Sequence, residues 1–159
     1  MKILALGDVV GRRTLSYLSK NLWQKRAALG ADFVIANGEN VADIKGLTVA
    51  DAEELLAAGV DLITTGNHVF DKREIYDHLD TSRHILRPVN YPGSAPGEGA
   101  RVVTVAEGWR MLLDRDDPVA DVVRLHRMAI DGGDFRADAA WKTIEEMNTT
   151  TGHYFRGAE

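Results

Sequence analysis

The sequence predicts an α/β domain in which a parallel sheet forms the core and helices flank it. Strand-like and helix-like segments alternate over the first 90 residues. The strand-like segments are short apolar runs, as in sheets buried on both faces. Their spacing leaves room for helical crossovers, which favours parallel pairing. With 159 residues, of which 45% are hydrophobic, the chain is long enough to bury one substantial core.

Each element of this domain is predicted by a local signal. Residues 3–6 form an apolar run that Gly7 and Asp8 stop. Residues 13–28 carry apolar side chains at three- and four-residue spacing, which is typical of an amphipathic helix, and Gly30 ends it. A strand over 33–36, a helix from Thr48 to Gly59, a strand over 60–65, a helix over 72–79 and a strand over 85–86 follow in the same way.

The C-terminal part of the chain has a different pattern. Residues 91–100 are rich in proline and glycine and predict a loop, and residues 101–105 and 109–113 predict a hairpin. From Asp117 to Met147 the apolar spacing predicts helix, in which we place His126. We therefore expect an α/β domain over residues 1–113 and a mainly helical extension over residues 114–159.

The composition excludes several classes of protein. No apolar run approaches the roughly 20 residues that span a bilayer, so we expect no membrane segment. The chain has no cysteine, which excludes a disulfide framework, zinc knuckles and thiol catalysis. Its net charge of −5 disfavours a broad nucleic-acid-binding face. Together these features predict a cytoplasmic protein.

Polar side chains follow three of the predicted strands. They are Asp8 after the first strand, the segment 37–40 with Glu39 and Asn40 after the second, and Gly66, Asn67 and His68 after the third. Because ligands bind outside the carboxyl ends of parallel strands, we expect these groups to converge. Each residue alone also suits a turn, a helix cap or the surface. Their joint occurrence favours a site for a phosphate or for iron, manganese or zinc.

Longer motifs around these residues are similar to those of a known family. Residues 1–11, 37–48, 59–71 and 86–97 have its motifs in its order and spacing. Over residues 1 to about 113 the sequence resembles the N-terminal half of the YmdB-like metallophosphoesterases, a branch of the calcineurin-like superfamily. The resemblance implies half of an αββα metallophosphoesterase sandwich.

The resemblance also implies an activity and roles for individual residues. The expected enzyme is a phosphoric ester hydrolase that uses two divalent metal ions, iron or manganese with zinc as an alternative. Its expected substrates are small phosphodiesters such as cyclic nucleotides. Asp8 would bind one metal, Glu39 would bridge both and Asn67 would bind the second. Asn40 would bind a metal or a phosphate oxygen, and His68 would face the phosphate as an acid or as a stabiliser of the transition state.

The sequence departs from the family after residue 113. The family's second half supplies further metal-binding histidines in an Asp-Phe-His-Ala-Glu-like stretch and a Gly-Thr-His-Thr-His motif, and this sequence contains neither. Residues 114–159 contain two histidines, His126 and His153. We therefore expect weak hydrolysis or none from this chain alone. The alternative is a non-catalytic protein that binds a phosphate ligand, or a dimerising scaffold in which a second copy covers the sheet.

Overall fold

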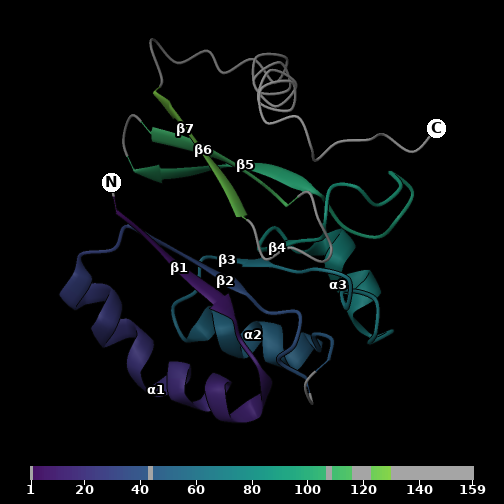
Figure 1. Ribbon diagram of the computed structural model, residues 1–159, viewed down its shortest axis with the longest axis horizontal. Helices are drawn as coiled ribbons and strands as arrows, with labels where there is room; N and C mark the ends of the chain where they lie inside the picture. Colours follow the sequence, from purple (N-terminus) through teal and green to yellow (C-terminus); the bar gives the residue numbers. More distant parts are fainter. Residues whose placement is uncertain (1, 43–44, 107–108, 116–122, 130–159) are drawn as a thin grey trace.

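The computed structural model describes residues 2–42, 45–106, 109–115 and 123–129. The elements run in the order β1 (Ile3–Asp8), α1 (Gly11–Leu29), β2 (Phe33–Asn37), α2 (Val49–Ala57), β3 (Leu62–Thr64), α3 (Ile75–Thr81), β4 (Ile85–Leu86), β5 (Ala100–Ala106), β6 (Trp109–Arg115) and β7 (Val123–Ala129). Strands β1–β4 form a parallel sheet in sequential order, and β5–β7 form an antiparallel sheet (Figure 1). The predicted fold class, a parallel-sheet core with flanking helices, is confirmed.

Helix α1 ends and helix α2 begins at the predicted signals, whereas α3 runs over Ile75–Thr81 and not over the predicted residues 72–79. In α1, Leu15, Leu18 and Leu22 are buried at three- and four-residue spacing. The helix ends where Gly30 takes a φ of 60°, a left-handed conformation that glycine adopts without strain. In α2 the side chain of Thr48 accepts a hydrogen bond from the backbone N–H of Asp51 at 3.1 Å, which caps the helix.

The parallel sheet packs on both of its faces, because alternate residues of a strand point to opposite sides. Helices α1 and α2 cover one face, where Val34 of β2 and Ile63 of β3 join Leu15 and Leu55 in the larger apolar cluster (Figure 1). On the other face, a smaller cluster packs against β5; its members are Phe33, Ile35, Leu62 and Leu86, with Ile3, Val103 and Val105 at its margin. The parallel sheet therefore lies between a layer of helices and the strand β5.

The C-terminal part differs in one respect from its prediction. The hairpin of β5 and β6 is confirmed, with Val103 opposite Met111. The predicted helix is wrong for residues 123–129, which form β7 and pair antiparallel with β6, His126 opposite Leu112. Residues 123–126 alternate apolar and polar, so they fit a strand, and β6 offers an open edge for hydrogen bonding. The rest of that predicted helix, with His153 beyond it, lies outside the described residues, and the boundary at residue 113 stays a prediction.

Within the part of the chain that the structure describes, no helix has both the length and the apolar character needed to cross a membrane.

Candidate functional site

The carboxyl ends of β1, β2 and β3 lie side by side at one edge of the parallel sheet. Asp8 at the end of β1 is in register with Asn37 at the end of β2, which is in register with Thr64 at the end of β3. Backbone hydrogen bonds continue past the strands, from Val9 N–H to the Asn37 carbonyl at 3.0 Å and from Gly38 N–H to the Thr64 carbonyl at 2.9 Å. The three loops with the candidate residues therefore start from one edge, as the sequence predicts.

Asp8 and Asn40 form the first contact within the candidate site. The side-chain amide of Asn40 donates from Nδ2 to Oδ1 of Asp8 at 2.8 Å. The carbonyl of Asn40 in turn accepts from Gly11 N–H at 3.0 Å, which fixes the backbone that positions this amide. Asp8 is exposed and Asn40 is half-buried, so a ligand can reach the pair from solvent.

Glu39 is the buried carboxylate of the site, with a residue exposure of 4%. Its Oε2 accepts the backbone N–H of His68 at 3.2 Å, which joins the loop after β2 to the loop after β3. Gly66 lies directly against this carboxylate. A Cβ at Gly66 would come within 2.6 Å of Cδ of Glu39, and still closer to both oxygens, so any larger residue would push this carboxylate out of its place. A carboxylate is costly to bury unless donors or cations compensate its charge, which fits a ligand for a cation.

His68 is held between two side chains of its own loop. Its Nδ1 lies 2.8 Å from Oδ2 of Asp71, and its Nε2 lies 3.2 Å from Nδ2 of Asn67. With the Nδ1–H donating to Asp71, Nε2 accepts from Asn67, and the ring orientation is fixed from both sides. Asn67 is exposed and His68 is partly exposed, so both remain accessible to a substrate.

Two further residues belong to this region and were missed by the sequence analysis as site groups. Asp71 follows His68 by three residues within one turn, a spacing that could have identified it. Tyr91 stacks edge-on against Phe70, with ring centroids 5.2 Å apart. Burial, together with the charges of Glu39 and Asp71, raises the pKa of Tyr91 above its usual value. Its hydroxyl is therefore protonated at neutral pH, close to the candidate site.

The donor set fits a divalent metal in part. Among the described residues, no group of three His, Asp or Glu side chains lies close enough to hold one ion together. A metal ion bound here by Asp8 and Glu39 would need further ligands, for which the side-chain amides of Asn40 and Asn67 are the candidates. Oxygen ligands with one imidazole nearby suit iron, manganese or zinc. The hydrogen bond from His68 N–H orients the Glu39 carboxylate at the ends of the strands, where a metal ligand would have to lie.

Arg12, at the start of α1, is bound by other side chains. Its guanidinium lies 2.8 Å from Asp51 Oδ1 and 3.0 Å from Glu54 Oε2. The hydrogen bond to Asp51 and the charge of Glu54 raise the pKa of Arg12 further above its usual value. The residue therefore links α1 to α2 and keeps its positive charge near the exposed edge of these helices.

The sequence matches a known protein family over most of its length. The model of the family described as YmdB-like protein matches residues 4–114. A relative from Bacillus subtilis (strain 168), named 2′,3′-cyclic-nucleotide 2′-phosphodiesterase, is 40% identical over 127 residues, which cover 74% of this chain and 48% of the relative.

Two solved structures share the fold. A hypothetical protein from Thermus thermophilus has a TM-score of 0.65 and 39% identity, over 70% of this chain and 43% of its own. A Mycoplasma pneumoniae protein described as a novel phosphatase has a TM-score of 0.68 and 26% identity, over 94% of this chain and 51% of its own. The chain spans about half the length of these proteins. Since the family match includes every candidate residue from Asp8 to His68, the chain belongs to the YmdB-like protein family.

Proposed function

We propose that this chain is a metal-dependent phosphodiesterase that acts on small phosphodiesters such as cyclic nucleotides. The observation that carries the proposal is the buried carboxylate of Glu39, held between Gly66 and the backbone N–H of His68 where three parallel strands end. The B. subtilis relative, which is named a cyclic-nucleotide phosphodiesterase, supports the choice of substrate class.

Four side chains would hold the metal ions. Asp8 and Asn40 would serve one ion, Asn67 would serve the other, and Glu39 would bridge the two. Iron and manganese suit this set best, with zinc as the alternative. When bound, such ions neutralise charge on the phosphoryl oxygens and lower the pKa of water to near neutrality.

The chain's own polar groups would bind and orient the substrate. With Nδ1 of His68 tied to Asp71, Nε2 is the nitrogen that would exchange a proton or a hydrogen bond with a phosphodiester, in place of its hydrogen bond from Asn67. The Asn40 amide can turn one of its N–H groups to a phosphate oxygen while the other stays on Asp8. The neutral hydroxyl of Tyr91 provides a further donor at neutral pH.

Hydrolysis of bis(p-nitrophenyl) phosphate and of 2′,3′-cyclic AMP by the manganese-loaded full chain tests the proposal. We expect weak metal-dependent turnover, because the histidine motifs of the family's second half are absent from this sequence. Glu39→Gln should lower it further, by about 100-fold, because the amide lacks the charge of the bridging carboxylate. Asp77→Asn changes an exposed carboxylate on α3 and is the matched control. Absence of turnover, or equal turnover by Glu39→Gln, would refute the proposal and favour a non-catalytic phosphate-binding or scaffold protein.

A further inference from the structure

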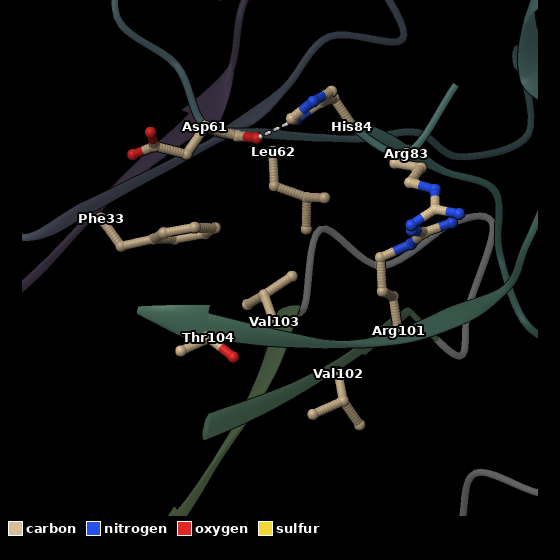
Figure 2. A pocket seen from close by; sticks show the side chains of 9 residues that line it. All are labelled: Phe33, Asp61, Leu62, Arg83, His84, Arg101, Val102, Val103 and Thr104. Carbon is tan, nitrogen blue, oxygen red and sulfur yellow. Dashed lines mark hydrogen bonds between the residues drawn. The ribbon is translucent and has the colours of Figure 1, made fainter. Parts of the chain in front are cut away.

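A pocket opens at the other end of the parallel strands, where β2 and β3 begin. It has a volume of about 340 Å³ and lies between the beginnings of β2 and β3 and the strand β5 (Figure 2). Phe33, the first residue of β2, lines it, whereas Asn37 at the other end of β2 adjoins the candidate metal site. The length of this strand, about 13 Å at 3.3 Å per residue, separates the two sites.

One end of this pocket is positively charged. Arg83, before β4, and Arg101, in β5, both line it, and their side chains extend towards each other in Figure 2. Two guanidinium groups that face each other repel unless an anion lies between them. Glu98 forms an ion pair with Nη2 of Arg101. Across the described residues, no carboxylate pairs with Arg83.

Arg101 also has an unused donor. Its side chain is 17% exposed, and its Nε is shielded from solvent without a hydrogen-bond acceptor in the described part of the chain. A buried donor without a partner is costly, so native proteins rarely keep one without a bound group or water to accept from it. The described side chains therefore leave the guanidinium of Arg101 one acceptor short.

The remaining walls of the pocket are mainly apolar. Val103 is half-buried and points into the space between the two sheets, whereas Leu62 and Phe33 beside it are already buried in the smaller apolar cluster (Figure 2). Asp61 lines the pocket as well, but its carboxylate already binds Arg26 at 2.9 Å and the backbone N–H of Val34 at 2.7 Å. Its charge is therefore compensated locally, as that of Arg101 is by Glu98, and it does not cancel the charge of Arg83 at the other end.

We propose that this pocket binds a small phosphomonoester, with the phosphate on Arg83 and Arg101 and the organic part against Val103. The guanidinium fork matches the oxygens of a phosphate group and can donate two parallel hydrogen bonds. The volume lies within the range of small-molecule sites. This ligand site is independent of the proposed hydrolysis at the opposite edge.

Isothermal titration calorimetry on the full chain tests this site. The protein carries Asp8→Asn and Glu39→Gln and is kept in metal-free buffer. Binding of the probes at the candidate metal site then does not contribute to the measured heat. The probes are adenosine 5′-monophosphate and inorganic phosphate. We expect saturable binding of one nucleotide per chain, tighter than that of phosphate. Arg83→Gln and Arg101→Gln should each weaken it about tenfold or more, as loss of a hydrogen bond to a charged group does.

The same titration provides a control variant and the results that would contradict the proposal. Arg73→Gln removes an exposed arginine outside the pocket and should leave the affinity unchanged. Arg83 is exposed, so Arg83→Gln should keep the fold. This variant therefore tests the proposal even if Arg101→Gln unfolds through loss of the Arg101–Glu98 ion pair. Absence of saturable binding, or binding that Arg83→Gln leaves unchanged, would overturn the proposal. Equal affinity for phosphate and nucleotide would overturn the role of the apolar wall.

Discussion

Gly66→Ala is the substitution that tests the geometry around Glu39 most sharply. The new Cβ would lie 2.6 Å from Cδ of Glu39, whereas ordinary contact begins near 3.4 Å. The Cδ atom must therefore move by about 0.8 Å, and the two oxygens, which lie closer to the new Cβ, must move further. Because it is the far end of a flexible side chain, it can do so without moving the backbone. It would then leave its hydrogen bond to His68 N–H, which is already 3.2 Å long.

The expected loss falls on function more than on stability. A displacement near 1 Å of a positioned group lowers turnover by about 100-fold. We expect that loss in hydrolysis of bis(p-nitrophenyl) phosphate, with weaker manganese binding in calorimetry. Local overpacking costs about 1–3 kcal/mol, so the free energy of unfolding should fall by an amount near the lower end of that range.

Gly7→Ala is the matched control, because Gly7 adjoins the other candidate carboxylate, Asp8. A Cβ at Gly7 would meet no atom within 4 Å. We expect this variant to keep wild-type turnover and metal affinity, with unfolding by urea changed by about 1 kcal/mol at most. If Gly66→Ala matched Gly7→Ala in turnover and metal affinity, the inferred role of the Glu39 carboxylate would be refuted.

Three further predictions concern positioning, packing and pH. Asp71→Ala removes the partner of His68 and should lower turnover about 10- to 100-fold with unchanged metal content, measured by elemental analysis; unchanged turnover would contradict this positioning role. Leu55→Ala empties a fully buried position and should lower the free energy of unfolding in urea by about 2–5 kcal/mol, whereas Leu29→Ala, at 53% exposure, should cost far less; equal costs would contradict the described core. The pKa of Tyr91 is raised in the folded protein, so this group's contribution to stability is present below pH 10.0 and is lost as the pH rises through the folded pKa. Tyr91→Phe should therefore lose less stability than wild type between about pH 8 and pH 11 in urea titrations, and equal losses would count against the environment described for Tyr91.

The fold of the first 90 residues could be predicted from local signals because each element has its own. Apolar runs that end in Gly7–Asp8 or Asn37–Gly38 mark strands whose carboxyl ends must meet in a parallel sheet. The convergence of Asp8, Glu39 and His68 at one edge follows from that rule.

Features that depend on contacts between distant segments could not be predicted in this way. The strand β7 forms where apolar spacing also suits a helix, and the open edge of β6 decides between them. The contact of Glu39 with Gly66 joins two separate loops. Arg83 and Arg101 line one pocket only because β5 packs against the parallel sheet. Tertiary packing, which residue spacing does not encode, sets all three.

The central claim is that the sheet edge with Asp8 and Glu39 is a metal site. Elemental analysis of the full chain, purified without chelator and loaded with manganese, tests it most directly. We predict at least one ion per wild-type chain, a loss of bound metal in Glu39→Gln, and unchanged content in Asp77→Asn. A metal-free wild-type chain, or equal metal content in wild type and Glu39→Gln, would contradict the claim.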